Sequence, residues 1–228
     1  MNIWKKYLIE FISVFVAVFL AFALSNWSEN RREDNAEIKI LSEISNGLMK
    51  DLDDIHTNID GHKEGIKACR FWRDVVNDRS YSNDSIGWYY FCITRDFISV
   101  QNTSGYESLK SKGLEILKND TLRYQIISLY EYDYETLRKL EEEYYEMQFH
   151  ENYFQKINEV VSPYFNFDAK GNVKSVSTPM ALSKRNKNTV LSAIWKIQGN
   201  RKFILSYYCK IEKKVNRLIE NIDKEFDR

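Results

Sequence analysis

The chain has 228 residues, of which 33 are Lys or Arg and 33 are Asp or Glu, so its formal net charge at pH 7 is zero. This balance gives no overall positive field, and we therefore expect no nucleic-acid partner. Glycine (8 residues) and proline (2 residues) are scarce, which argues against a turn-rich β fold and favours long helices.

An apolar stretch from Tyr7 to Trp27 has about the 20 residues that an α-helix needs to cross the hydrocarbon core of a bilayer. No charged residue occurs between Phe11 and Ser28. Trp4 and Tyr7 lie at the start of the stretch and Trp27 lies at its end, as interfacial aromatic anchors do. The sequence therefore predicts a single-pass membrane protein with the lipid bilayer as its first partner.

A secretory signal peptide is the competing interpretation of this stretch. Ala21–Ala23 has the small-x-small form of a cleavage site, and Lys5 and Lys6 provide a short basic start. The apolar run continues through Leu24, which favours an uncleaved anchor. We expect residues 1–28 to form a tail and anchor in a bacterial inner membrane, with residues 29–228 as a domain in the periplasm.

One face of the predicted span is small and polar, while bulky side chains occupy the rest. At about 100° per residue the candidate association face comprises Glu10, Ser13, Ala17, Ala21 and Ser25. Small residues spaced by four allow helices to approach closely in lipid, which predicts a homo-oligomer. Glu10 has two interpretations, an edge carboxylate paired with Lys6 or a group that takes part in assembly.

Beyond the span, apolar residues recur at intervals of three and four, which predicts a helix from the membrane to about Asn77. Its apolar positions are Leu41, Ile44, Leu48, Leu52, Ile55, Ile59 and Ile66. Gly61 and Gly65 are expected to be soft interruptions. We expect this helix to be one arm of an intramolecular bundle; the alternative is a straight stalk shared between subunits.

Shorter elements follow in the middle of the chain. Asp84 or Ser85 can cap a helix that continues through Phe91, with a strand as the alternative for this aromatic segment. The stretch from 102 to 120 predicts a short helix that begins at Thr103 or Ser104, stops at Gly113 and is followed by a new start near Asn119.

Three further helices are predicted after this point. One runs from Asp120 to about Val161, where Pro163 stops it. A long connection covers 165–186, and a final pair of helices, 189–198 and 201–226, is expected to break at Gly199. The last helix carries a coiled-coil-like seam that should return along the first helix. Its residues are Ile204, Tyr208, Ile211, Val215, Leu218 and Ile222.

Two separated motifs resemble an uncharacterised family of single-span membrane proteins common in Bacteroidota. The first is the anchor, with Glu10 early and an Asn-Trp-x-Glu ending at Glu29; the second is Tyr-Glu-x-Leu-Lys-Ser-x-Gly at 106–113, followed by Leu-Lys-Asn-Asp-x-Leu-Arg at 117–123. Family members usually carry glycine where Ile9 stands, and another at mid-helix. The family's function is unknown, so the resemblance implies an architecture without a mechanism.

The candidate ligating groups do not form a recognisable site. His56 and His62 are six residues apart and face different sides of a helix, unlike a zinc-binding pair. Glu146 and His150 share a face but lack further ligands, so we interpret them as a solvated pair. The run 141–143 of three glutamates is expected to be surface charge.

The three cysteines, Cys69, Cys92 and Cys209, match no metal or redox spacing. We interpret them as small core residues, with one disulfide possible and none required. No phosphate-binding loop or nucleophile motif occurs. We therefore expect no enzymatic activity, no catalytic or metal-binding residue and no cofactor.

Taken together, the sequence predicts an all-α protein with one N-terminal transmembrane helix followed by a bundle of long helices. The first functional hypothesis is an interaction, sensing or scaffold protein of the cell envelope that works through an unidentified protein partner. The alternative is an oligomeric membrane effector or pore subunit assembled through the transmembrane helix. Tyrosines crowd the segment 130–164, where they either fill helix flanks or form a contact surface.

Overall fold

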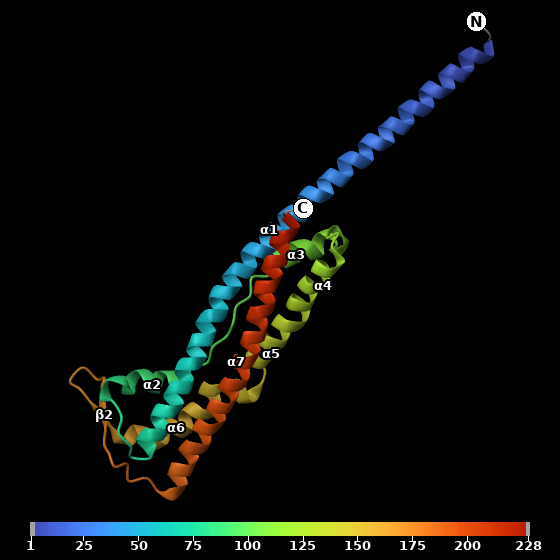
Figure 1. Ribbon diagram of the computed structural model, residues 1–228. Helices are drawn as coiled ribbons and strands as arrows, with labels where there is room; N and C mark the ends of the chain where they lie inside the picture. The colour runs from blue at the N-terminus through green and yellow to red at the C-terminus, as the bar shows by residue number, and fades with distance from the viewer. Residues whose placement is uncertain (1–2, 227–228) are drawn as a thin grey trace.

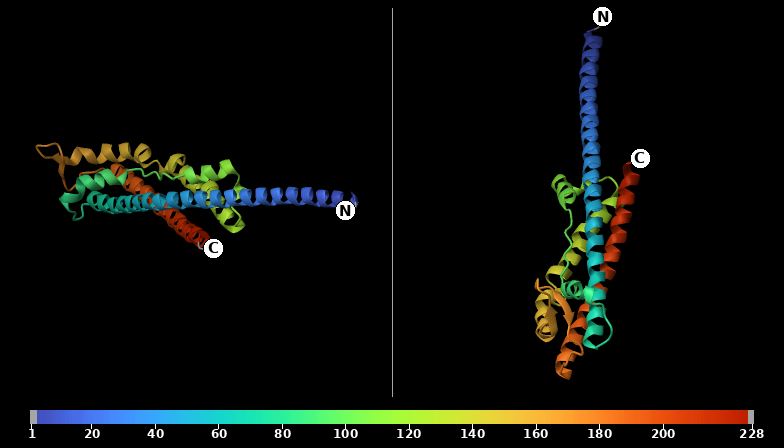
Figure 2. Two further views of the ribbon diagram at one scale, coloured as in Figure 1. Left: turned by 90° about the horizontal axis from the view of Figure 1, so that it is seen from above. Right: turned by 90° about the vertical axis from the view of Figure 1, so that its left-hand side faces the viewer.

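The computed structural model describes residues 3–226, except for the side chains of residues 3, 5, 6 and 9. Helix α1 (Ile3–Val76) is a single rod whose first part extends alone and whose second part enters a helical body (Figure 1). Helix α7 (Lys184–Phe226) runs back along α1 towards the bare rod, and its C-terminal end diverges from α1 (Figures 1 and 2). The helical bundle predicted from the sequence is confirmed, with α1 as one of its arms.

The buried face of α1 begins at Ile40 and continues to Val76. Its apolar members follow the predicted spacing, because residues three and four apart lie on the same side of a helix. Asp51 and His62 are also buried and occupy the same stripe, between apolar neighbours. The helix continues without a break through Gly61 and Gly65, so these glycines do not interrupt it.

The buried residues of helix α7 recur at every third or fourth position from Val190 to Ile222, with the adjacent Ala193 and Ile194 both buried. The predicted break at Gly199 is wrong, because the helix passes through it. A single glycine costs a helix only about 1 kcal/mol relative to alanine, and the apolar seam on both sides outweighs that cost. Arg201, buried within the seam, is the one charged residue among the buried positions of this helix.

A third layer of short elements covers the pair α1 and α7 (Figure 2). The turn η1 (Asn83–Ser85) leads into α2 (Ile86–Ile93), so the helix predicted for this aromatic segment is confirmed and the strand alternative is wrong. An extended segment, residues 95–103, then connects α2 to α3 (Ser104–Lys112); we call it the strap.

The turn between α3 and α4 follows its sequence signals. Helix α3 ends at Gly113, whose φ of 97° favours glycine. After η2 (Leu114–Ile116), the side chain of Asn119 accepts a hydrogen bond from the backbone N–H of Leu122 at 3.1 Å and so caps α4 (Asp120–Ile127). The predicted stop at Gly113 and start near Asn119 are both confirmed.

The long helix predicted over 120–161 is interrupted. Its observed elements are α4, the π-helical η3 (Ser128–Tyr134), α5 (Glu135–Glu142), the 3₁₀ turn η4 (Tyr145–Met147), the π-helical η5 (His150–Phe154) and α6 (Gln155–Val161). Side chains compete for the backbone at the break. Gln148 donates to the carbonyl of Glu141 at 2.6 Å, and Asp96 accepts from the backbone N–H of Phe149 at 2.7 Å.

Pro163 lies in the 3₁₀ turn η6 (Ser162–Tyr164), which follows α6. The long connection beyond it contains an antiparallel hairpin of β1 (Phe165–Phe167) and β2 (Val173–Val176), with Phe165 opposite Val176. In Figure 1 this hairpin, α2 and α6 gather at the end of the body far from the bare rod. The molecule therefore has a rod end and a distal end, joined by α1 and α7.

Candidate functional site

The predicted association face lies on the bare part of α1. All of its members, Glu10, Ser13, Ala17, Ala21 and Ser25, are exposed, as are the aromatic anchors Trp4, Tyr7 and Trp27. The apolar window of this helix, near the N-terminus, is long enough to cross a membrane and buries none of its residues in the body. The pairing of Glu10 with Lys6 falls outside the described side chains.

A second candidate site is a pocket of about 540 Å³ at the distal end, between α2, the start of the strap and η5. Its size lies within the range of about 300–1,000 Å³ that is common for small-molecule sites. Its lining is largely aromatic with a few polar groups, and comprises Tyr90, Phe91, Thr94, Arg95, Asp96, His150 and Phe154. We call it the distal pocket.

Structural contacts hold the polar groups of the distal pocket in place. The carboxylate of Asp96 accepts the backbone N–H groups of Phe149 at 2.7 Å and His150 at 3.3 Å, and burial raises its pKa. The guanidinium of Arg95 lies 4.5 Å from the ring centre of Phe91. The His150 ring stacks on Phe154 with centroids 4.7 Å apart. Both rings belong to the π-helical turn η5, a kind of distortion often found at functional sites, and both line the pocket.

Arg201 supports the pocket from behind and is fully buried. One of its terminal nitrogens, Nη2, donates to the carbonyl oxygens of Cys92 and Ile93, both at 3.2 Å, and of Arg95 at 2.7 Å. These carbonyls lie at and just beyond the C-terminus of α2, where the helix dipole is negative. Arg201 therefore caps α2 from a different helix and fixes the start of the strap.

The charge of Arg201 has no carboxylate partner within ion-pair distance among the described residues. Burial lowers its pKa to about 10, which leaves it protonated at neutral pH. The carbonyl dipoles and the face of Phe149, 4.4 Å from the guanidinium carbon, stabilise the cation instead.

His62 completes this buried centre from α1. Its Nδ1 lies 3.1 Å from Nη1 of Arg201, and because an arginine only donates, Nδ1 must accept. The imidazole is therefore neutral, with its proton on Nε2, which has no hydrogen-bond partner among the described residues. Burial, and then the charge of Arg201, lower the pKa of His62 to about 3. His62 is thus not a proton switch near neutral pH.

Two glycines make room for this centre on α1. A Cβ atom at Gly65 would lie 2.4 Å from Cζ of Arg201, and one at Gly61 would lie 2.2 Å from the ring of Phe97 in the strap. Carbon atoms do not approach that closely without displacement. The two glycines therefore let α7 and the strap dock directly on the α1 backbone.

Two carboxylates of α1, buried Asp51 and half-buried Asp54, hold the rest of the strap. On α1, Asp51 accepts the backbone N–H of Asn102 at 2.7 Å and the hydroxyl of Tyr134 at 2.7 Å. Asp54 accepts the backbone N–H of Val100 at 3.0 Å and the hydroxyl of Ser99 at 2.9 Å. An extended segment has unpaired N–H groups, and these acids satisfy them.

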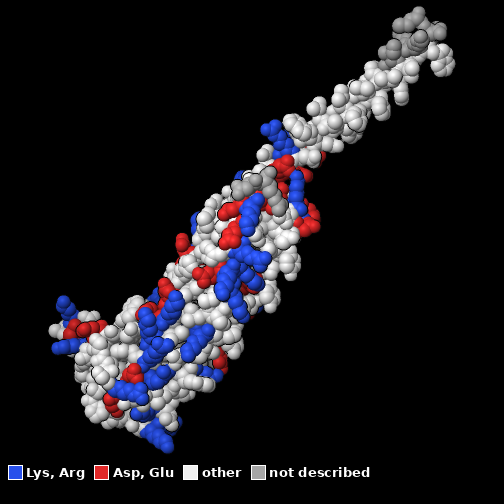
Figure 3. All heavy atoms as spheres, viewed as in Figure 1, with Lys and Arg blue, Asp and Glu red and all other residues white. Residues whose placement is uncertain are grey.

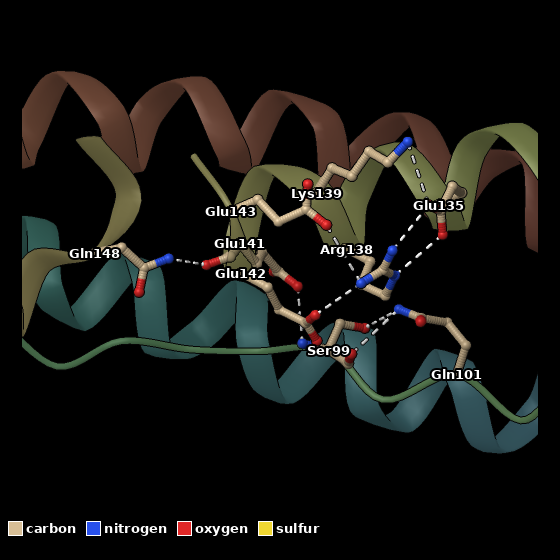
Figure 4. A network of polar contacts seen from close by, with 9 residues as sticks. All are labelled: Ser99, Gln101, Glu135, Arg138, Lys139, Glu141, Glu142, Glu143 and Gln148. Atoms are coloured by element: carbon tan, nitrogen blue, oxygen red, sulfur yellow. Dashed lines mark hydrogen bonds and ion pairs between the residues drawn. The ribbon is translucent and has the colours of Figure 1, made fainter. Parts of the chain in front are cut away.

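Glu141 of α5 hydrogen-bonds to the same strap from the side opposite α1 (Figure 4). It accepts the backbone N–H of Ser99 at 3.0 Å and the hydroxyl of Tyr208. Its neighbours Glu142 and Glu143 instead point to Arg138 at the surface. The prediction that the whole run 141–143 is surface charge is therefore wrong for Glu141, which is only 5% exposed.

Burial perturbs two of these acids strongly. It raises the pKa of Asp51 to about 6 and that of Glu141 to about 7, although the hydrogen bonds from the strap and the tyrosines oppose the rise. Both carboxyls consequently change charge in the range near neutral pH. We therefore expect the stability that these two carboxyls contribute to depend on pH.

Two other residues considered as metal ligands in the sequence, Glu146 and His56, each contact one oppositely charged or titratable side chain of α7. Glu146 contacts Lys196 at 2.7 Å, and His56 contacts Glu212 at 2.8 Å. The described residues contain no group of three or more His, Cys, Asp or Glu side chains able to hold a metal ion.

The cysteines of the described chain are free, and Cys69 and Cys92 are buried as predicted. Burial raises the pKa of Cys69 to about 11, which makes it a poor nucleophile. Cys209 is exposed, which corrects its assignment to the core.

Sequence reasoning missed Arg201 and the acids that hold the strap. A signal for Arg201 exists, because the seam of α7 extends backwards from Ile204 by three residues to this position. The acids carry no comparable pattern, since their partners are backbone groups more than 40 residues away. No protein-family model, no curated protein and no solved structure matches this chain.

Proposed function

We propose that the chain is a single-pass membrane protein whose helical domain is a non-enzymatic sensing and interaction module. One observation carries this proposal: α1 is a continuous helix that supplies both the apolar rod and the wall of the buried centre around Arg201. A change at the distal end can therefore reach the membrane through one rigid element. We place the domain in the periplasm, anchored in a bacterial inner membrane.

The geometry suits transmission over a long distance. At about 1.5 Å per residue, Gly65 lies roughly 57 Å along α1 from Trp27, the aromatic residue at the end of the apolar stretch. Helix α7 packs along the same length of α1 and carries Arg201, which holds the back of the distal pocket. A small displacement at the pocket would shift one packed helix relative to the other.

The pocket's own contacts support a binding role over a catalytic one. Asp96 uses its two carboxylate oxygens to accept backbone N–H groups, and Arg95 lies over an aromatic ring. Neither group is positioned as a free acid, base or nucleophile. We therefore propose that the aromatic walls take a small, partly apolar ligand, whose occupancy is reported through α1 and α7.

Chemical occupation of the pocket tests this proposal without a known ligand. In a Cys209→Ser background, which removes the exposed thiol, His150→Cys would place a reactive thiol in the pocket wall. N-ethylmaleimide would then fill part of the pocket. Glu151→Cys is the matched control, because this neighbour is exposed and does not line the pocket.

Hydrogen–deuterium exchange of residues 29–41 is the measurement, made on the full chain in phosphatidylcholine nanodiscs. We expect labelling at position 150, but not at 151, to change exchange there by about fivefold or more, the lower end of typical coupling between sites. Equal exchange in both labelled proteins would refute transmission. The domain would then be a static scaffold.

A further inference from the structure

A cleft of about 820 Å³ opens where the bare rod of α1 enters the body. One side is the face of α1 that includes Ser28, Glu29, Arg32 and Glu33, and the other is the turn that begins at Lys112 and connects α3 to α4. Figure 3 shows basic and acidic side chains gathered at this junction, directly beside the uncharged rod. The cleft is thus a charged site at the end of an apolar segment.

The position of the cleft follows from the proposed anchoring, on which this inference rests. If the apolar part of α1 spans a bilayer, Trp27 lies at the interface with water. Ser28 follows it directly, and Arg32 lies about 7.5 Å from Trp27 along the helix axis at 1.5 Å per residue. The cleft therefore opens into the layer of lipid headgroups.

The free charges of the cleft balance. Glu115 also lines it, but its carboxylate pairs with Arg123 at 2.8 Å. Glu29, Arg32, Glu33 and Lys112 form no ion pair with any described residue. Two cations and two anions without an ion-pair contact in the described part of the chain therefore face one concave space; Lys118, which pairs with Asp34 outside the cleft, also attracts Glu33. An anionic ligand would meet as much repulsion as attraction, whereas a zwitterion can satisfy both signs.

We infer that this cleft binds the headgroup of a zwitterionic phospholipid with a primary ammonium group, such as phosphatidylethanolamine. Arg32 and Lys112 pair with the phosphodiester, and Glu29 and Glu33 accept hydrogen bonds from the ammonium. A primary ammonium has three N–H donors for these carboxylates. The quaternary ammonium of phosphatidylcholine has none, so the cleft should discriminate between the two lipids.

Lipid retention by the full chain tests the inference. The protein is inserted into nanodiscs of equal parts phosphatidylethanolamine, phosphatidylcholine and phosphatidylglycerol, extracted in mild detergent and analysed for retained lipid by mass spectrometry. The variant Arg32→Gln/Lys112→Gln removes both cations. Arg31→Gln is the matched control, because Arg31 lies 5.6 Å from the ring centre of Trp27 and does not line the cleft.

We expect the unaltered protein and Arg31→Gln to retain phosphatidylethanolamine in preference to phosphatidylcholine. In the double variant the ratio of retained phosphatidylethanolamine to phosphatidylcholine should be about two- to fivefold lower, as expected for the loss of exposed ion pairs. Equal retention of these two lipids, a preference for phosphatidylglycerol, or equal losses in Arg31→Gln and the double variant would overturn the inference. Failure to enter nanodiscs at all would instead refute the proposed anchoring, so the two failures are distinguishable.

Discussion

Gly65 of α1 and Arg201 of α7 meet so closely that a Cβ at Gly65 would lie 2.4 Å from the guanidinium carbon. Arg201 cannot move aside easily, because its two terminal nitrogens donate to three carbonyl oxygens and to His62. The glycine is therefore a requirement of the buried centre and not a weak point in the helix. It brings the backbone of α1 into direct contact with the arginine behind the distal pocket.

Replacing Gly65 with alanine should destabilise the protein by about 1–3 kcal/mol, the usual cost of overpacking a core. Gly199→Ala is the control, because a Cβ there has open space within 4 Å. That substitution should leave stability unchanged or raise it by up to about 1 kcal/mol, the helix preference for alanine. Urea unfolding of the full chain in detergent measures both changes. Equal effects of the two substitutions would contradict the tight contact.

Arg201→Met should be more damaging than any surface substitution on α7. It removes a cation and leaves the carbonyl groups of Cys92, Ile93 and Arg95 unpaired in the interior. Hydrogen bonds to charged groups contribute about 1.5–3 kcal/mol, so we expect a loss of at least about 3 kcal/mol. Lys202→Met, at an exposed neighbour, should change stability by less than about 0.5 kcal/mol. A small loss from Arg201→Met would show that α2 does not depend on this cap.

The architecture was predictable to the extent that it depends on periodicity. The spacing of apolar residues locates α1 and the C-terminal part of α7, and Asn119 marks the start of α4 through its cap. These signals are local, since residues three or four apart share a helix face. The continuity through Gly199 was not predictable from a local cost alone, because packing on both sides decided it.

The buried polar centre depends on contacts that local sequence does not encode. Arg201 stands in an apolar seam, and its partners are carbonyl oxygens of a segment more than 100 residues earlier. Glu141 resembles its neighbours in sequence, yet it alone of the three glutamates is turned inward to the strap. Backbone partners leave no pattern of side chains, so only the folded arrangement reveals them.

The stability of the protein should fall as the pH rises through 7. Burial raises the pKa of Glu141 from 4.5 to about 7 and that of Asp51 from 3.8 to about 6. The folded protein therefore binds more protons than the unfolded chain between these values. The contribution of these two carboxyls to the free energy of unfolding is largest below their unfolded pKa values. It falls as the pH rises through 6 and 7. Urea titrations between pH 5.5 and 8 measure this slope.

Glu141→Gln should flatten the upper part of that pH dependence. The amide keeps an oxygen for the N–H of Ser99 and supplies a donor to the hydroxyl of Tyr208. Above pH 7 we expect the variant to be more stable than the parent by up to a few kcal/mol, given about 1.4 kcal/mol per pKa unit. Glu143→Gln, which alters a surface pair with Arg138, should keep the parental slope. Identical slopes for the parent and both variants would exclude Glu141 as the source.

The candidate association face of the span makes a separate prediction. Ala17 is exposed on the bare rod, and a larger side chain there would hold two helices apart in lipid. Ala17→Leu should therefore reduce the oligomeric species measured in nanodiscs, while Val18→Leu, on another face, should not. Glu10→Gln should act as Ala17→Leu does if this carboxylate takes part in assembly. A monomeric parent protein would exclude both this face and the effector alternative.

The side of the membrane that the domain occupies can be measured with a native thiol. Cys209 is exposed on α7, whereas Cys69 and Cys92 are buried and should not react in the folded protein. If the domain is periplasmic, a membrane-impermeant maleimide should label Cys209 in cells whose outer membrane alone has been permeabilised. Cys209→Ser should abolish the signal. Labelling that appears only after lysis of the inner membrane would place the domain in the cytoplasm. The distal pocket would then receive intracellular ligands, and the cleft lined by Arg32 and Lys112 would face the headgroups of the inner leaflet.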